Sequence, residues 1–405
     1  MPSVADIDQR RPGVFRNLRT KEPLKPEKIS LCAEKLPVEV WERVFDALAE
    51  NGQLLALLDC ALTCRLWAPR CLWHLARHVV VCSRKHGQRV GKAMVTSHRI
   101  SLATAITFRK PVGFVLGRPI TSVETLGIGD YSPSVGDWKA KVFHADVFTH
   151  LRITFPSVTR LTLDNTTFPS VVVFARLVFS FPRLTRFACH FVAFATGGYL
   201  RGRALPPKGF AMTDVELYQS DDVVDFLVER SAEPLTYEDV RERDRQGASA
   251  SLRSLDVWSI SHRLDSLGGL GCFKYLESLT LAFDAFEQRL DPGTVWDDLY
   301  NVLGGLASSK LQQFTISFIA DFSDIHGCGI SDTLQTLSTG VSDRIFARID
   351  DLLAGPRYHH LQTICFRLWF DHSMDLCIPG SPSKQLWFRF LSCHFPRLST
   401  HESFR

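Results

Sequence analysis

The chain has 405 residues, of which 45% are hydrophobic and 22% are charged, a balance typical of soluble globular proteins. A chain of this length has more residues than one ordinary hydrophobic core can organise, so we expect two domains or an array of repeats. The net charge of +4 is small and no basic stripe alternates with aromatic residues, so nucleic acid is not an expected partner.

Residues 1–33 are predicted to form a disordered basic tail. Basic, acidic and proline residues are interspersed there, and no apolar segment of a secretory signal appears. The apolar run 171–181 is interrupted by Arg176 and is too short to cross a bilayer, so no membrane is expected as a partner. The eleven cysteines are irregularly spaced, unlike a small disulfide framework. We therefore expect reduced thiols and a cytoplasmic or nuclear protein.

The first predicted helix follows this tail, over about residues 36–48. Pro37 suits the first helical position, where its missing N–H costs nothing. Val40, Val44 and Leu48 recur at four-residue spacing, which predicts an apolar helix face. The dipeptide Asn51-Gly52 then supplies a stop.

A second helix is predicted over residues 54–62, and Pro69 begins a further helical segment or kinks it. This region has more large apolar side chains than a hairpin of about 40 residues can cover. Two interpretations stay open: the spare apolar surface binds an external partner, or it packs on the domain that follows.

Residues 36–40, Leu-Pro-Val-Glu-Val, followed by residues 60–67, Cys-Ala-Leu-Thr-Cys-Arg-Leu-Trp, resemble an F-box. In that family a Leu-Pro pair opens the first helix and a Cys-Arg-x-Trp element lies in the second half. The variants Trp41-Glu42-Arg43 and Ala68-Pro69-Arg70 resemble a large fungal branch of the family. The resemblance covers residues 34–78 as a helical F-box domain, while Pro69 departs from the general pattern and leaves the phase of the third helix open.

The F-box resemblance implies binding to a Skp-type adaptor protein, which links such chains to a cullin scaffold. Three of the residues that it assigns to this contact, Val44, Leu62 and Trp67, have an alternative role as internal core of the F-box, because both roles require apolar burial. The adaptor-binding residues that the resemblance implies are Leu36, Pro37, Val40, Val44, Leu57, Leu62, Cys64 and Trp67.

Residues 79–405 carry a recurring pattern, apolar-x-x-apolar-x-apolar, which predicts short strands with one face buried. Residues 161–165 resemble the strand and asparagine step of a leucine-rich repeat. The pattern begins at Val123, Val158, Leu184, Met212, Leu252, Leu276, Leu311 and Leu361.

Helices are predicted between these strands, over residues 171–179, 221–229, 295–306 and 342–353. Strands and helices that alternate at roughly 24 to 50 residues predict an irregular, leucine-rich-repeat-like βα solenoid with a parallel sheet on its inner face. The expected fold class is therefore α/β, and a non-repeating α/β domain is the alternative.

Details of the repeat region carry further expectations. The sequence Phe-Pro-x-apolar precedes strands at residues 155 and 181, and its return at residue 395 predicts the start of a truncated last unit. Leu161, Leu255, Leu279 and Ile364 are predicted to face the core, whereas Thr162 and Asp256 face outward between buried positions. Residues 229–251 are predicted to be an exposed loop or a solvated helix.

The sequence contains no phosphate-binding loop, no Gly-x-Ser-x-Gly and no His-Glu-x-x-His. Cys60, Cys64 and Cys71 lack the close paired spacing of a zinc module, and they are interpreted as small buried thiols. Three further groups of histidine and cysteine are scattered without a nucleophile-and-base spacing. We therefore expect no metal, no cofactor and no catalysis. The groups are His326 with Cys328, His359-His360 and Cys393-His394.

The F-box resemblance implies a substrate-recognition adaptor of an SCF-type, cullin-based ubiquitin ligase. The helices would hold the Skp-type adaptor, and the repeat region, which resembles the C-terminal part of the same fungal proteins, would bind an unidentified protein target. Two alternatives stay open. One is an F-box scaffold without a role in ubiquitination, and the other is an unrecognised α/β enzyme, since catalytic triads assemble in space rather than in sequence.

Overall fold

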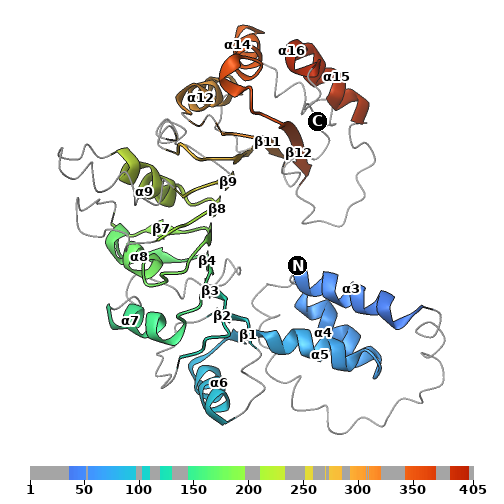
Figure 1. The fold of residues 1–405 in the computed structure, drawn as a ribbon, viewed down its shortest axis with the longest axis vertical. Coiled ribbons are helices and arrows are strands. Elements are labelled where there is room, and N and C mark those ends of the chain that lie inside the picture. Colours follow the sequence, from blue (N-terminus) through green and yellow to red (C-terminus); the bar gives the residue numbers. More distant parts are fainter. Residues whose placement is uncertain are drawn as a thin grey trace, which may run out of the picture. The chain divides into compact units, whose positions relative to one another are not determined.

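The computed structural model divides the chain into two compact units, Met1–Arg77 and His78–Arg405. Each unit is described by itself (Figure 1). The basic tail and the pair His326 and Cys328 lie outside the described residues. The structure describes residues 36–51, 53–96, 103–109, 119–129, 145–196, 210–232, 251–258, 270, 273–284, 292–306, 308, 310–320, 343–370 and 384–400.

The first unit contains three helices: α3 (Val38–Glu50), α4 (Leu54–Thr63) and α5 (Ala68–Arg77). Pro37 precedes α3 as its N-cap, one position earlier than the sequence predicts. Asn51 ends α3, and Pro69 lies in the first turn of α5, where its missing N–H costs nothing. The predicted start of a new helical segment near Pro69 is thus confirmed.

A small aromatic core holds these three helices together. Phe45, Leu57 and Cys71, one from each helix, are its buried centre. The Trp67 ring packs against it, with ring centroids 4.4 Å from Trp41 and 5.7 Å from Phe45. A core of so few side chains stabilises the unit only modestly.

The second unit is built on a ten-stranded sheet in the order β1-β2-β3-β4-β6-β8-β9-β10-β11-β12. Every neighbouring pair in it is parallel, which confirms the predicted α/β class with a parallel sheet. Strands β5 (Thr167–Phe168) and β7 (Ala193–Phe194) pair separately. The ten strands are β1 His78–Val81, β2 Ala105–Phe108, β3 Thr125–Gly129, β4 Arg160–Asp164, β6 Arg186–His190, β8 Asp214–Tyr218, β9 Ser254–Trp258, β10 Ser278–Asp284, β11 Gln313–Ala320 and β12 Thr363–Phe370.

Helices connect most of these strands, and α7, α8, α9 and α12 lie on one side of the sheet (Figure 1). The four predicted helices are confirmed as α8, α9, α12 and α14. Among the described helices, none is long and apolar enough to cross a membrane. The helices of this unit are α6 Arg84–Thr96, α7 Ala145–Thr154, α8 Val171–Val178, α9 Asp221–Ala232, α12 Pro292–Gly305, α14 Asp343–Leu353, α15 Lys384–His394 and α16 Pro396–Ser399.

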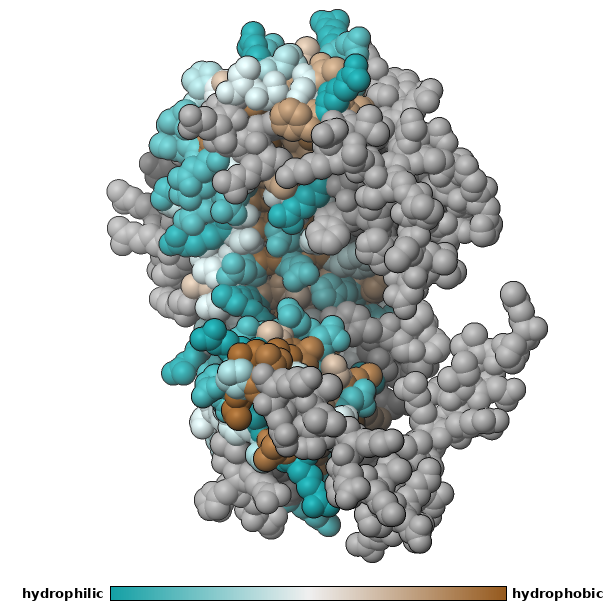
Figure 2. All heavy atoms as spheres, turned by 90° about the vertical axis from the view of Figure 1, so that its right-hand side faces the viewer, coloured by the Kyte–Doolittle hydropathy of each residue, from teal (hydrophilic) through white to brown (hydrophobic). Residues whose placement is uncertain are grey.

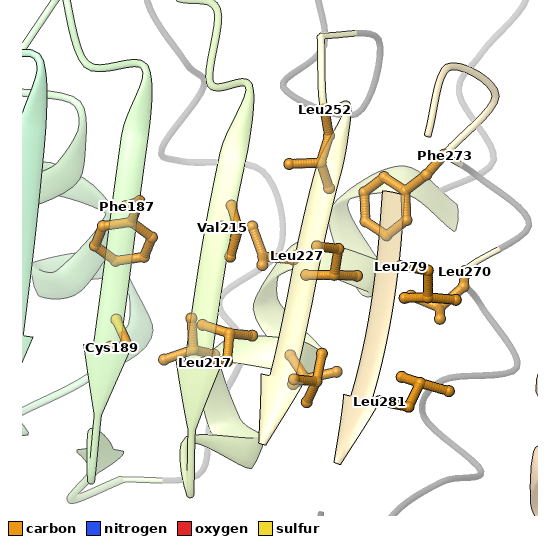
Figure 3. Close-up of a cluster of buried hydrophobic side chains, with 14 of the residues drawn as sticks. Phe187, Cys189, Val215, Leu217, Leu227, Leu252, Leu270, Phe273, Leu279 and Leu281 are labelled. Carbon is orange, nitrogen blue, oxygen red and sulfur yellow. The ribbon is translucent and has the colours of Figure 1, made fainter. Parts of the chain in front are cut away.

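All eight predicted strand patterns fall on strands of the one sheet. The register places Leu161, Leu255, Leu279 and Ile364 in a single row across it, together with Phe187, Val215 and Phe314. All seven side chains are buried, because alternate residues of a strand share one face. Figure 3 shows Phe187, Val215 and Leu279 in this layer, with Leu227 of α9 among them. The four predicted core residues are therefore confirmed.

Strands β1 and β2 were not predicted. The β1 residues, His-Val-Val-Val, follow α5 directly without a turn signal, and β2 reads Ala-Ile-Thr-Phe without the leucine spacing of the other strands. Both nevertheless continue the parallel ladder, in which His78 aligns with Ala105 and Ala105 with Thr125. Tertiary pairing therefore extends the sheet beyond its recognisable repeats.

A repeated turn precedes several strands. The carbonyls of Phe155, Phe181, Phe273 and Tyr358 each accept a hydrogen bond from the N–H three residues later, and all four rings are buried. The aromatic ring fills the space between helix and sheet while the turn redirects the chain into the strand. The recurrence of Phe-Pro before β4 and β6 therefore has a structural cause.

The third Phe-Pro sequence, at residue 395, is predicted to begin a truncated last unit, but the described residues that follow it do not form a strand. Pro396 starts the short helix α16 instead. The buried Asp350 carboxylate accepts hydrogen bonds from the N–H groups of Arg397 and Leu398, both at 2.9 Å. A carboxylate at these free N–H groups favours a helix start, which explains the difference.

Candidate binding surfaces

Most of the exposed large hydrophobic side chains of the described residues lie in the helical unit. Among the described residues, thirteen large hydrophobic side chains are exposed, and nine of them lie between residues 36 and 73. Figure 2 shows hydrophobic residues (brown) gathered in the lower part of the view. We name these nine residues the helical apolar surface: Leu36, Val38, Val40, Val44, Leu55, Leu62, Leu66, Leu72 and Trp73.

Helix α3 has two apolar stripes rather than one. Trp41, Phe45 and Leu48 face the core of the unit. Val40 and Val44, four residues apart and therefore on one face, are each 40% exposed. A helix needs only one apolar stripe to pack on its neighbours, so the second stripe is available to another molecule.

Helix α4 repeats this arrangement. Leu57 is completely buried, whereas Leu55 and Leu62, seven residues apart on one face, are 77% and 71% exposed. Leu66, in the turn that follows, is also exposed. The exposed leucines therefore extend from α4 into the connection to α5.

The structure places the eight residues predicted for adaptor binding in different environments. Cys64 and Trp67 are half-buried, and Trp67 packs on the aromatic core. Leu57 offers no exposed surface and holds α4 on α3 and α5, so its place is in the core rather than on a contact surface. The exposed residues of the set are Leu36, Pro37, Val40, Val44 and Leu62.

An ionic network joins α3 to α5. Arg70 donates from Nη2 to both carboxylate oxygens of Asp46, at 2.7 and 3.0 Å, and Nε2 of the buried His74 lies 2.7 Å from Oδ1. The Arg70 hydrogen bonds lower the pKa of Asp46, desolvation opposes this, and the hydrogen bond with His74 lowers the pKa further. Such paired contacts fix the geometry of two helices as well as their distance.

We expect Asp46→Asn to destabilise the helical unit by about 1 kcal/mol at neutral pH, because the pair is partly exposed to water. The lowered pKa makes this stabilisation complete above the ordinary aspartate pKa and removes it as the pH falls through the lowered value. Hydrogen exchange of the full chain at pH 7 should therefore show faster exchange in α3 and α5. Asp59→Asn, a change at an exposed position of α4, serves as the control, and equal exchange in both variants would contradict the role of the network.

The second candidate surface is the sheet face that points away from the helices. Thr162 and Asp256 occupy one row of this face, as predicted, since they alternate with buried residues. The same row includes Glu216, which aligns with Asp256 on the next strand. Hydrophilic residues (teal) lie in the middle of Figure 2.

A histidine ends β6 on this face between two acidic residues. Its Nδ1 lies 2.7 Å from Oδ1 of the buried Asp164, and its Nε2 lies 3.8 Å from Oε1 of Glu216. Burial lowers the pKa of His190, but the interactions with Asp164 and Glu216 outweigh it and raise the pKa to about 9. His190 is therefore a cation at neutral pH, and its presence lowers the pKa of Glu216.

Asp256 has the opposite electrostatic environment. Burial raises its pKa, Thr280 donates a hydrogen bond that opposes this, and the charges of Glu216 and Asp214 raise it further. Arg367 is the cation that lowers it. Keeping the Asp256 carboxylate ionised therefore costs free energy in the isolated chain.

The described cysteines and histidines are distributed over both units. Burial raises the pKa of the Cys71 thiol, and Cys60 packs beside it. His394 packs at 4.3 Å from the Phe346 ring, next to the exposed Cys393. Within the described ranges, no group of three or more His, Cys, Asp or Glu side chains is arranged to hold a metal.

The His190 pair with Asp164 was not anticipated from the sequence. The two residues lie 26 positions apart, and each is the last residue of its strand. Aligning the strand patterns by their apolar positions would have placed them side by side, because the register pairs the strand ends directly. The spacing of the repeats in the sequence is therefore the signal that could have predicted this pair.

Comparison of the chain with protein-family models finds no match, and no curated protein matches its sequence. The arrangement of helices and parallel strands is therefore known from the structure alone, and the comparisons add no family. The specific motifs of the F-box resemblance lie in residues 34–78, and the resemblance of the repeat region to the same fungal proteins depends on short apolar patterns.

Proposed function

We propose that this protein is a substrate-recognition adaptor of an SCF-type, cullin-based ubiquitin ligase. The helical unit binds a Skp-type adaptor and through it a cullin, and the parallel βα unit binds a protein target. The order and spacing of Leu36-Pro37 and Cys64-Arg65-Leu66-Trp67 support the first part.

The observation that carries the proposal is the helical apolar surface. Nine of the thirteen exposed large hydrophobic side chains in the described residues belong to a unit with a three-residue buried centre. Exposed apolar patches on soluble proteins mark interaction sites, and amphipathic helices with a free apolar face bind in grooves or on other helices. A partner that covered Val40, Val44, Leu55 and Leu62 would remove this surface from water.

The mechanism is proximity rather than chemistry on this chain. One chain holds the target on its βα unit and the ligase on its helical unit. This tethering raises the effective concentration of target lysines near the conjugating enzyme. Ubiquitin transfer itself occurs on the other subunits. Cullin, a ring-type subunit and a conjugating enzyme should all be required for it.

Charging the exposed α3 stripe should abolish adaptor binding. In Val40→Glu with Val44→Glu, both positions are exposed, so neither substitution buries a charge in the folded chain, and substitutions at such surface positions have small effects on stability. We expect the variant chain to fold and to lose co-purification with a co-expressed Skp-type adaptor, because burying two carboxylates in an apolar contact is costly.

The matched control is Ile153→Glu, which charges an exposed hydrophobic residue of α7 in the other unit. It should leave the complex intact. Retention of the adaptor by the folded α3 variant would contradict the proposed contact, and loss of the adaptor in both variants would show that the effect is not specific to the helical apolar surface.

A scaffold without a role in ubiquitination is distinguished by target turnover. Proteins that co-purify with both the intact chain and the α3 variant should have longer half-lives in cells that contain only the variant. Unchanged half-lives of all such proteins would contradict the ligase role while leaving adaptor binding in place.

A further inference from the structure

Phe191 combines backbone strain with exposed hydrophobic surface. It follows β6 with a φ of 55°, in the left-handed region that a bulky side chain rarely adopts, and the residue is 46% exposed. Asn165 and Gln219 occupy the equivalent positions after β4 and β8 with φ of 46° and 45°. Polar residues serve this turn at two neighbouring strands, so the phenylalanine is not required by the backbone.

The three turns have the same backbone role. The N–H groups of Asn165, Phe191 and Gln219 donate to the carbonyls of His190, Tyr218 and Trp258, the last residues of the adjacent strands. Phe191 differs from the other two because its side chain is apolar and exposed. Strained and exposed apolar residues cost stability, and their presence points to a function.

Aromatic side chains gather around Phe191. The Tyr218 ring lies 5.0 Å from the Phe191 ring, and Tyr218 aligns with Trp258 on the next strand. One row away on the same face, Glu216 aligns with Asp256. We name these five residues, Phe191, Glu216, Tyr218, Asp256 and Trp258, the aromatic–acidic patch.

Of the two carboxylates of the patch, Glu216 shares His190 with Asp164, and Asp256 is the less well neutralised. Like charges directly abreast on neighbouring strands, about 4.8 Å apart, disfavour the folded chain. His190 lies nearer to Asp164, at 2.7 Å, than to Glu216, at 3.8 Å, and Arg186 pairs with Asp214. Arg160 and Arg367 act on Glu216 and Asp256 at longer range. A cation delivered by another molecule would complete this arrangement.

We propose that the aromatic–acidic patch binds a segment of a protein target in which a lysine or arginine stands next to an apolar residue. This inference rests on the proposed function, since it identifies the chemistry of the target that the βα unit holds. Glu216 and Asp256 attract the cation, and the faces of Tyr218 and Trp258 stabilise it further. Phe191 contacts the neighbouring apolar side chain, as exposed aromatic residues do at interface centres.

The test uses a displayed library of random 12-residue peptides selected on the full chain, which is fused to a solubility partner so that no Skp-type adaptor is needed. Peptides selected by the unaltered chain should be enriched in lysine or arginine beside an apolar residue. The same peptides, synthesised and measured by fluorescence anisotropy, should bind at least tenfold more weakly to Glu216→Gln with Asp256→Asn. Asp351→Asn, which removes an exposed acid of α14 that pairs with Arg397, is the matched control and should bind them unchanged.

Phe191→Asn separates binding from folding. Asparagine tolerates the left-handed turn, so the thermal midpoint should stay equal or rise while peptide affinity falls at least tenfold. Selection without enrichment of cationic residues, or equal peptide binding by Phe191→Asn, would overturn the proposal. Adaptor binding of these variants is measured separately, so failure of the adaptor complex would contradict the proposed function and leave the peptide result unaffected.

Discussion

Replacing Leu279 with alanine is expected to destabilise the βα unit by about 2–5 kcal/mol. Leu279 is fully buried in β10, and its register partners Leu255 and Phe314 are buried on both sides. The substitution removes apolar contacts and leaves a cavity that neighbouring strands, held by the ladder on each side, fill only partly. Thermal unfolding of the full chain should show a lower midpoint temperature for the variant than for the unaltered chain.

The damage should also be local. In a repeat array each unit contacts mainly its neighbours, so hydrogen exchange should increase most in β9, β10 and β11. Helices α3, α4 and α5 should keep their protection. The control Leu62→Ala truncates an exposed leucine of α4 and should change stability by less than about 0.5 kcal/mol. Uniform loss of protection throughout the chain after the Leu279 substitution would contradict the repeat interpretation.

The second large effect is expected at His190. Its pKa is raised from 6.5 to about 9 in the folded chain, so its contribution to stability is fully present below pH 6.5 and is lost as the pH rises through 9. The shift corresponds to about 3 kcal/mol. The groups that hold the cation are the carboxylates of Asp164 and Glu216.

His190→Gln should remove this pH dependence. Glutamine retains a donor for the buried Asp164 but cannot become charged, so the variant should be less stable at pH 6.5 and close to the unaltered chain above pH 9. Urea unfolding at a series of pH values measures the difference. His150→Gln, at an exposed histidine of α7, is the control. A parallel pH dependence for His190→Gln and the unaltered chain would contradict the ion pair.

The α/β class and most of the sheet follow from local patterns in the sequence. The spacing of Leu276, Leu279 and Leu281 predicts a strand with one buried face, because alternate residues of any strand point to the same side. Such patterns depend on neighbours within a few positions. They therefore predict both the strands and the inward row that includes Leu161 and Ile364.

Which apolar residues of the helical unit are exposed is decided by tertiary structure. Both stripes of α3 are apolar, so helical periodicity treats Val44 and Phe45 alike, and only packing against Trp67 buries the second and not the first. Leu57 and Leu62 of α4 differ for the same reason. Periodicity gives the position of a residue around a helix axis, whereas the neighbouring helices determine which direction is the core.

Contacts between distant residues are likewise set by the folded chain. The sequence predicts strands that follow Val158 and Leu184, but the 2.7 Å contact between Asp164 and His190 depends on the register of parallel strands. At Phe395-Pro396, the predicted start of a truncated last unit, Asp350 favours helix α16 through hydrogen bonds across 47 and 48 positions. Local sequence determines which conformations are accessible, and long-range hydrogen bonds and charges select among them because their partners meet only after the chain has folded.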